Sequence, residues 1–252
     1  MSALASNPFS LESKRILVTG ATSGIGKACC VQIATMGGKV VAVGRDEGGL
    51  AETIQSLSGQ GHESVIMDLN EYESLPQKML ELGPLNGLVH SAGIQVTQPI
   101  QQLDFAKCRE MLDVNVFATL ALAKGFRHRK VCVPGSSLVF ISSVMANVSS
   151  PGMAGYSASK SAVNGLVRAL AIEFSRDKHR VNCIAPSLVQ TRMWNQMKER
   201  MDESQIDTLQ SLHPLGIGSP EDVAHAVTFL ISDAAKWITG TCLVIDGGYS
   251  AQ

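Results

Sequence analysis

Apolar residues in this chain form short runs that alternate with segments of helical spacing. Runs rich in Val, Ile and Leu predict strands at 15–19, 39–44, 64–69, 85–93, 137–142, 180–185 and 242–246. Between several of them, apolar positions recur every three or four residues and predict helices, among them 72–82, 104–123 and 220–230. This alternation indicates an α/β fold, in which a doubly wound parallel sheet of about seven strands carries helices on both faces.

Composition and charge narrow the possibilities. The chain has 252 residues, of which 45% are hydrophobic and 17% are charged. That is enough apolar material for one large core, and no linker-like stretch divides the chain, so we predict a single domain over 1–252. The net charge of −1 gives no basic footprint for nucleic acid or for an anionic membrane.

The cysteines and the N-terminal segment predict a cytoplasmic protein. The six cysteines, at 29, 30, 108, 132, 183 and 242, include no C-x-x-C pair and mostly stand among apolar residues. We expect buried thiols in a reducing compartment, and no metal. The N-terminus lacks a basic region followed by an apolar run, and no uncharged stretch approaches the length of a membrane span. We therefore expect a soluble protein with no membrane or nucleic-acid partner.

A glycine-rich loop, GATSGIG, joins the first predicted strand to the helix that follows it. Gly20 permits a sharp turn off the strand, Gly24 lets backbone amides approach a pyrophosphate, and Gly26 lets helix and strand pack closely. The strand-to-helix context favours dinucleotide binding over a tight turn with no ligand. The sheet is therefore expected to be of the Rossmann type.

Residues at the ends of the next strands would complete the dinucleotide site. Arg45 follows the second strand, where an arginine accommodates the 2′-phosphate of NADP(H) and an acidic residue would instead accept from the ribose of NAD(H). Asp46 favours NAD(H) unless it caps the next helix, so NADP(H) is favoured and NAD(H) is the alternative. Asp68 either accepts from the adenine amino group or caps a turn. After the fourth strand come small residues against which a cofactor can lie: Ser91, Ala92 and Gly93.

Tyr156 and Lys160 lie four positions apart in a segment expected to be helical from 154 onward. This spacing places both side chains on one face of a helix. An ammonium beside a phenol stabilises the phenolate and brings its pKa toward neutrality, as a general acid or base requires. Taken alone, the pair also fits an ordinary surface helix. Ser143 at the end of a strand, together with the glycine loop, favours a site that moves a proton on and off a carbonyl or alcohol oxygen.

Three other segments each have two interpretations. Asn115, a polar amide in an apolar helical face, is either a bridge to backbone or a water site. The amphipathic, methionine-rich segment 191–215 is either a lid over the substrate or a packing element at a subunit contact. The basic run at 126–130 is either a solvated helix end, where cations suit the helix dipole, or a docking site for an acidic partner.

The chain resembles the short-chain dehydrogenase/reductases over nearly its whole length. The segment 213–248 is most similar to their 3-oxoacyl-acyl-carrier-protein reductase-like branch, although many sugar, polyol and steroid dehydrogenases share this pattern. The family usually has Asn where this chain has Ser91, a difference that affects local stability and cofactor affinity more than catalysis. The resemblance is carried by GATSGIG from Gly20, Ser91-Ala92-Gly93, Asn115, Ser143, Tyr156-Ser-Ala-Ser-Lys160 and Pro186-Ser-Leu-Val-Gln-Thr191.

The resemblance implies a role for each of these residues. Tyr156 would be the general acid/base and Ser143 would orient the carbonyl. Lys160 would bind the nicotinamide ribose and lower the Tyr156 pKa, and Asn115 would hold a water of the proton relay. The family also implies a homodimer or homotetramer. The implied cofactor contacts are Ile25 at the pyrophosphate, Val189 and Thr191 at the carboxamide, and further contacts at Thr22, Ser23, Leu69 and Pro186.

Three functions are compatible with these features. The leading one is an NADPH-dependent reductase that converts a ketone to a secondary alcohol, with a 3-oxoacyl thioester as the favoured substrate. The second is an NAD-linked alcohol dehydrogenase acting on a sugar, polyol or hydroxysteroid. The third is a cofactor-binding sensor or scaffold without turnover, for which the set of proton-relay residues would have no physical purpose.

Overall fold

The computed structural model describes residues 7–199 and 201–251, which form one parallel sheet with helices on both faces. Across the sheet the strands run in the order β3-β2-β1-β4-β5-β6-β7, and each adjacent pair is parallel. This is the Rossmann-type single-domain α/β fold predicted from the sequence. The strands are β1 Arg15–Thr19, β2 Lys39–Gly44, β3 Glu63–Ile66, β4 Leu85–His90, β5 Cys132–Ile141, β6 Arg180–Pro186 and β7 Cys242–Ile245.

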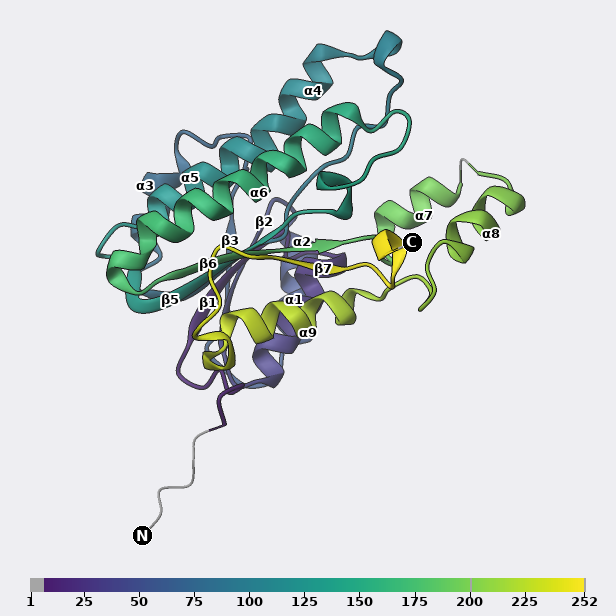
Figure 1. Cartoon of the computed structure of the whole chain (residues 1–252). Coiled ribbons are helices and arrows are strands. Elements are labelled where there is room, and N and C mark those ends of the chain that lie inside the picture. Colours follow the sequence, from purple (N-terminus) through teal and green to yellow (C-terminus); the bar gives the residue numbers. More distant parts are fainter. Residues whose placement is uncertain (1–6, 200, 252) are drawn as a thin grey trace.

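The helices lie in two layers, one on each face of the sheet. Figure 1 shows α1 and α9 together on one face, and α3, α5 and α6 on the other. The helices are α1 Gly24–Thr35, α2 Glu47–Gln55, α3 Leu75–Glu81, α4 Phe105–Leu112, α5 Ala118–Phe126, α6 Ala154–Phe174, α7 Arg192–Lys198, α8 Glu203–Ser211 and α9 Pro220–Ile231. A π-helical turn spans Asp113–Phe117, and 3-10 turns lie at Ile100–Gln102, Val144–Ala146, Ser175–Asp177, Asp233–Ala235 and Tyr249–Ala251.

Each central strand contributes to two cores. Successive residues of a strand point to opposite faces of the sheet. In β1, Leu17 packs in the core beneath α3, α5 and α6, whereas Ile16 and Val18 pack in the core beneath α1 and α9. In β5, Phe140 packs in the first of these cores and Val139 packs in the second. Burial on both faces explains why the strands are uninterrupted apolar runs rather than alternating ones.

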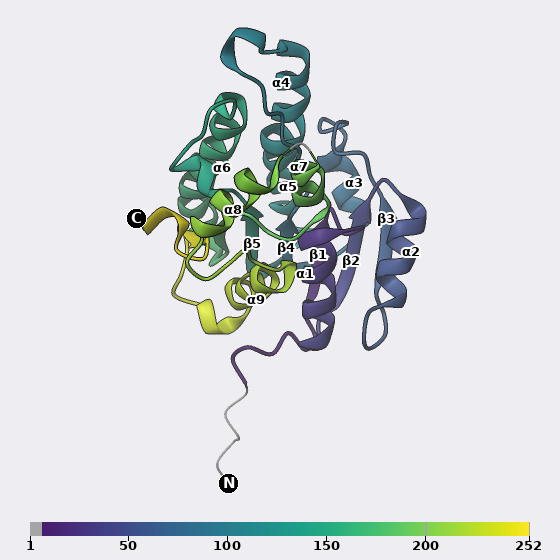
Figure 2. The same cartoon turned by 90° about the vertical axis from the view of Figure 1, so that its right-hand side faces the viewer.

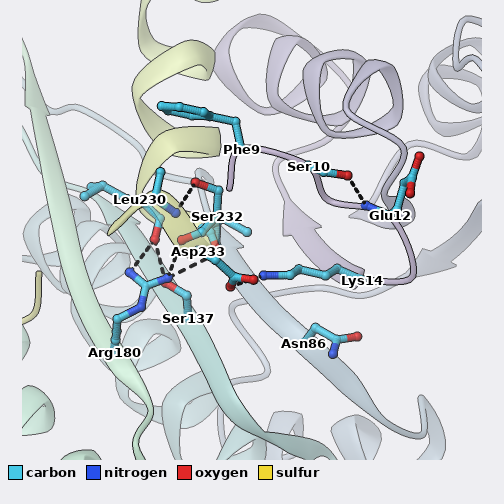
Figure 3. Close-up of polar contacts among 12 residues, drawn as sticks. Phe9, Ser10, Glu12, Lys14, Asn86, Ser137, Arg180, Leu230, Ser232 and Asp233 are labelled. Atoms are coloured by element: carbon cyan, nitrogen blue, oxygen red, sulfur yellow. Dashed lines mark hydrogen bonds and ion pairs between the residues drawn. The ribbon is translucent and has the colours of Figure 1, made fainter. Parts of the chain in front are cut away.

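A buried arginine holds the end of α9 at the edge of the sheet where the strands begin (Figure 3). Arg180, the first residue of β6, donates to the carbonyls of Leu230 at 2.6 Å, Ile231 at 3.2 Å and Ser232 at 3.0 Å. The Ser137 hydroxyl also donates to the Leu230 carbonyl, at 2.9 Å. The last carbonyls of a helix have no partner within it, so this arginine supplies donors that α9 lacks.

The third strand is shorter than predicted. It ends at Ile66 rather than at Leu69, although the Met67 amide still donates to the Gly44 carbonyl at 3.0 Å. The chain then turns, because Asp68 Oδ1 accepts from the backbone amide of Asn70 at 3.0 Å. β5, by contrast, begins at Cys132, five residues before the predicted start.

The predicted helix over 104–123 is divided into α4, the π-helical turn and α5. A π turn adds a residue to the helix and changes which positions face the core. Phe105 and Leu120, both apolar positions of the predicted helix, are 70% and 39% exposed. The predicted helix over 72–82 begins only at Leu75, whereas the helix predicted at 220–230 has Ser219 as its N-cap and Pro220 at its start, as expected.

Three cysteines, Cys29, Cys30 and Cys183, are buried, and the other three are partly exposed; all six are free thiols. In the described part of the chain, no group of His, Cys, Asp and Glu residues is arranged to hold a metal ion. Residues 7–199 and 201–251 contain no helix with the length and apolar character that crossing a membrane requires.

Candidate active site

A cavity of about 720 Å³ opens at the edge of the sheet where the strands end. Its wall runs from the glycine loop, past the ends of β2, β4 and β5, to α6 and the segment that leads into α7. Gly26 and Asn115 are outside its lining. The other predicted site residues all line it: Gly20, Thr22, Ser23, Gly24, Ile25, Arg45, Asp68, Leu69, Ser91, Ala92, Gly93, Ser143, Tyr156, Lys160, Pro186, Val189 and Thr191.

The glycine loop is too crowded for side chains at two of its positions. Gly20 has a φ of +67°, and a Cβ there would lie 2.9 Å from the amide nitrogen of Ala92. A Cβ on Gly26 would lie 2.1 Å from the carbonyl oxygen of Gly20. Gly20 therefore makes the turn off β1, and Gly26 lets α1 pack against that turn, as the sequence predicted.

The N-terminus of α1 faces the cavity and suits an anion. Ser23, its N-cap residue, makes no side-chain hydrogen bond to the first turn, whereas Asp46 caps α2 by accepting from the Gly49 amide at 3.2 Å. The first amides of a helix have no partner within it, and together with the helix dipole they favour a phosphate group. Gly24 and Ile25 line the cavity at this point. These residues fit the pyrophosphate of a dinucleotide.

Arg45 provides positive charge at the adenosine end of the predicted site. Its exposed guanidinium lies 4.0 Å from Asp68, measured from Nη1 to Oδ1. Asp46 serves as the cap of α2, which is one of the two roles the sequence left open for it. Asp68 accepts from the side-chain Nδ2 of Asn70 at 3.0 Å as well as from the backbone amide of Asn70, so the turn-capping interpretation holds. Asp68 also lines the cavity.

Tyr156 and Lys160 lie on the buried face of α6, and their side chains face the same cavity. They are 9% and 5% exposed, which excludes the alternative of an ordinary surface pair. The Lys160 ammonium lies 5.7 Å from the centre of the Tyr156 ring. It donates to the carbonyl of Ile141, the last residue of β5, at 2.9 Å. Lys160 thus ties α6 to the strand that leads to Ser143.

Burial determines the protonation states of this pair. It raises the pKa of Tyr156 to about 12, and the hydrogen bond with Ser143 opposes that rise. Burial also lowers the pKa of Lys160 to about 8, opposed by the charge of Cys183. The predicted lowering of the Tyr156 pKa is therefore not found: desolvation outweighs the hydrogen bond with Ser143, and the Lys160 ammonium donates to a strand carbonyl. At neutral pH the tyrosine is a phenol that can donate a proton.

Asn115 bridges to backbone, which was one of its two predicted roles. Its Oδ1 accepts from the Ile94 amide at 2.9 Å, while its Nδ2 donates to the Ile94 carbonyl at 2.9 Å and to Ser159 Oγ at 3.0 Å. A Cβ on Gly93 would lie 3.1 Å from Asn115 Oδ1 and 3.3 Å from Lys160 Nζ. Asn115 therefore holds the 93–94 backbone beside Lys160. The water relay implied by the family resemblance remains a prediction.

His90, which the sequence analysis missed, lies beside the site but does not line the cavity. It ends β4, is buried, and places Nδ1 2.7 Å from Thr19 Oγ1, which accepts from the Ala92 amide at 3.4 Å. Among the described residues its Nε2 has no hydrogen-bond partner. Burial lowers the pKa of His90 to about 3, the charge of Lys160 adds to this, and the Val114 backbone opposes it. The available signal was a histidine that ends an apolar strand immediately before Ser-Ala-Gly.

Comparisons with known proteins agree with this geometry. A family model described as enoyl-(acyl carrier protein) reductase matches residues 20–250. Galactitol 2-dehydrogenase (L-tagatose-forming) of Cereibacter sphaeroides is 33% identical over 248 residues, which cover 96% of this chain and 97% of that protein. 3beta-hydroxysteroid dehydrogenase 1 of Eggerthella lenta is 34% identical over 250 residues, 94% of each chain.

Solved structures show the same relationship. A crystal structure from Beutenbergia cavernae, described as an NAD(P)-dependent gluconate 5-dehydrogenase with bound NADP, is 34% identical with a TM-score of 0.89, covering 98% of this chain and 100% of that one. Fold and site together define an NAD(P)-dependent oxidoreductase of CH–OH and C=O groups. The chain belongs to the short-chain dehydrogenase/reductase family. The relatives named here support its 3-oxoacyl-acyl-carrier-protein reductase-like branch only loosely.

Proposed function

We propose that this protein interconverts a ketone and a secondary alcohol with NADP(H). The observation that carries the proposal is that Ser143, Tyr156 and Lys160 line one cavity with the glycine loop and the N-terminus of α1. When bound, the nicotinamide supplies or accepts a hydride. Ser143 donates a hydrogen bond to the substrate oxygen, Tyr156 gives or takes the proton there, and Lys160 holds the nicotinamide ribose.

Tyr156 is in the protonation state that a proton donor in reduction needs. With a pKa raised to about 12, the phenol is protonated at neutral pH and ready to give its proton to a developing alkoxide. Alcohol oxidation would first require the loss of that proton from a buried site. At neutral pH the cofactor-free protein therefore holds Tyr156 in the protonation state that reduction requires.

NADP(H) is the cofactor that the adenosine end of the cavity supports. Arg45 supplies a cation there, while Asp46 is engaged in capping α2. The Beutenbergia cavernae structure and a crystal structure described as a 2-deoxy-d-gluconate 3-dehydrogenase from Agrobacterium tumefaciens both contain NADP. The latter is 30% identical with a TM-score of 0.87, covering 98% of this chain and 100% of that one. At the nicotinamide end, we assign Val189 and Thr191 to the carboxamide.

Replacing Arg45 tests the choice of cofactor. Losing a charged hydrogen bond to the 2′-phosphate should weaken NADPH binding by roughly 10- to 100-fold in Arg45→Ala, with NADH binding little changed. A fluorescence titration of both nucleotides measures this. Arg176→Ala is the matched control, because Arg176 is exposed and outside the cavity lining. Equal weakening of both nucleotides in Arg45→Ala would contradict the assignment.

The named relatives shift the expected substrate away from a 3-oxoacyl thioester. They include dehydrogenases of galactitol, of D-threitol in Mycolicibacterium smegmatis and of a 3β-hydroxysteroid. We therefore propose a sugar, polyol or hydroxysteroid type of alcohol/ketone pair ahead of the thioester, and no role in fatty acid biosynthesis is drawn from them. A nicotinamide-coupled activity screen across these classes tests the proposal. Cofactor binding without turnover of any member would favour the sensor or scaffold instead.

The segment 191–215 supports the proposal of a substrate lid. It forms α7 and α8, which stand over the edge of the sheet where the strands end (Figures 1 and 2). Trp194 of α7 is buried and lines the cavity. A lid in this position would exclude water from the reacting carbonyl.

Exposed apolar side chains support a homo-oligomer. Phe105 of α4, Phe117 of the π turn and Leu120 of α5 are exposed on one stretch of helix. Large exposed apolar patches commonly mark protein interfaces. We propose that a dimer or tetramer covers them, and sedimentation velocity of Leu120→Glu should then show a smaller species than the wild type. The free thiols fit the cytoplasmic location that we propose.

A further inference from the structure

The substrate side of the cavity is walled by large apolar side chains. Tyr156 packs in a small apolar cluster with Met153, and Ile94 and Met145 pack against it. α7 and the segment that leads into it contribute a leucine, a tryptophan and two more methionines to the cavity wall. The apolar residues that form both walls are Met145, Met153, Leu188, Met193, Trp194 and Met197.

Most of the polar groups among these residues are engaged within the protein or exposed to solvent, and Gln95 Oε1 is an acceptor that has no partner among the described residues. Ser187 Oγ is 2.8 Å from His213 Nε2, and Gln95 Nε2 donates to Thr97 Oγ1 at 3.0 Å. The other polar side chains on this side, Glu110, Arg192 and Gln196, are exposed to solvent. Ser143 and Tyr156 are reserved for the reacting oxygen. In the described residues, the inner wall therefore offers few hydrogen bonds to any second hydroxyl of a substrate.

Such a wall discriminates between substrates by their carbon skeletons. A bound polyol would lose the water around every hydroxyl, and each hydroxyl without a new partner makes binding less favourable. An apolar ring system has no such hydroxyls to desolvate, and burying its surface against the wall favours binding. Methionine side chains are flexible enough to pack against irregular apolar shapes. The wall therefore suits an alicyclic skeleton and opposes an open-chain polyol.

We propose that the substrate is a ketone or secondary alcohol on an apolar alicyclic skeleton, of cyclohexanol to steroid type. This rests on the proposed function, because it assumes that Tyr156 and Ser143 mark the reacting oxygen. Of the sugar, polyol and hydroxysteroid substrates proposed above, this proposal selects the hydroxysteroid type.

Binding can be tested without turnover through Trp194. The chain has two tryptophans, and the other, Trp237, is 96% exposed. A Trp237→Phe protein keeps Trp194 as its single tryptophan reporter. With Tyr156→Phe added to stop turnover and NADP⁺ present, 4-tert-butylcyclohexanol and a 3β-hydroxysteroid should shift its emission to saturation, at concentrations at which galactitol and threitol leave it unchanged. A saturating response to the polyols and none to the alicyclic alcohols would overturn the proposal.

Turnover separates this proposal from the proposed function. We expect kcat/KM to be at least about 100-fold higher for the alicyclic alcohols than for galactitol and threitol. A few buried hydroxyls without hydrogen-bond partners are enough to produce this ratio. Met153→Gln should lower kcat/KM for the alicyclic substrates about 10-fold and narrow the ratio. Met36→Gln, half-buried at the end of α1 and outside the cavity lining, should leave the ratio unchanged.

Each contrary outcome has a distinct meaning. A preference for the polyols overturns the substrate class and leaves the proposed function standing. Cofactor binding without turnover of either class overturns the proposed function, and the substrate class falls with it. If Met153→Gln fails to fold, the substrate ratio of the wild type and the Trp194 titration still decide the question.

Discussion

Two buried cations beside neighbouring strands, Arg180 and Lys160, differ in how many backbone carbonyls they donate to. Arg180 stands where β6 begins and donates to three carbonyls at the end of α9. Lys160 faces the end of β5 and donates to one carbonyl, that of Ile141, although an ammonium has three donors. The donors of the Arg180 guanidinium are thus committed to structural hydrogen bonds, whereas the Lys160 ammonium makes only one such bond.

The difference extends to the two edges of the sheet. At the edge where strands begin, Ser137 and Arg180 are both committed to backbone carbonyls (Figure 3). At the edge where strands end, burial shifts the pKa values of Tyr156, Lys160 and His90, and Tyr156 and Lys160 face the cavity. Burial also lowers the pKa values of His179 and Arg180 at the first edge, but neither residue lines the cavity. Perturbed groups that face a cavity are typical of functional sites. Substitutions at the first edge should therefore affect stability, and those at the second should affect chemistry.

The largest expected effect is the loss of turnover in Tyr156→Phe. Removal of the phenol proton donor should lower kcat by about 1,000-fold or more, within the range for general acid catalysis. The thermal midpoint should change little, because the ring remains. NADPH absorbance and differential scanning calorimetry measure the two quantities. Turnover close to that of the wild type would place the proton donor elsewhere.

Arg180→Met should be the most destabilising of these changes. Carbonyls at the end of α9 would lose their buried donors, at a cost of about 4 kcal/mol in unfolding free energy. kcat/KM per folded molecule should be unchanged. Urea unfolding measures the loss. Arg127→Met is the matched control: Arg127 pairs with Asp177 in a partly exposed position, so its loss should cost less than about 1 kcal/mol. Equal effects of the two variants would remove the contrast between the edges.

The stability effect of Lys160→Met should depend on pH. The folded pKa of about 8 lies below the ordinary lysine value of 10.5, so between these values the unfolded wild type binds more protons than the folded one. Wild-type stability relative to Lys160→Met should therefore rise by roughly 3 kcal/mol from pH 7 to pH 10.5. Chemical unfolding of both proteins at several pH values measures this difference. A difference that stays constant with pH would show that Lys160 is not a lysine of lowered pKa.

The smallest effect is expected from Thr19→Val. This change removes the hydroxyl between His90 Nδ1 and the Ala92 amide. We expect a loss of about 1 kcal/mol in stability and a few-fold higher KM for NADPH, with kcat unchanged. Steady-state kinetics with varied NADPH separates the two constants. If kcat falls and KM does not, Thr19 and His90 act on the chemistry rather than on the cofactor loop.

The positions of the strands along the chain and the cofactor loop could be predicted from sequence because their causes are local. Strands buried on both faces are continuous apolar runs, and Gly20 and Gly26 stand where a side chain would collide with backbone. The π turn around Asn115 could not be predicted, because the apolar spacing continues through it. The direction of the Tyr156 pKa shift was also out of reach, since it depends on how tightly Met111 and Met153 pack around the phenol.

The most direct test of the account follows an isotope. NADPH deuterated at both C4 positions would be supplied with a ketone that the enzyme reduces, and the alcohol analysed by mass spectrometry. We predict one deuterium on the carbinol carbon from the wild type and from Arg180→Met, and label formed about 1,000-fold more slowly by Tyr156→Phe. Alcohol without deuterium, or label formed by Tyr156→Phe at the wild-type rate, would contradict the account.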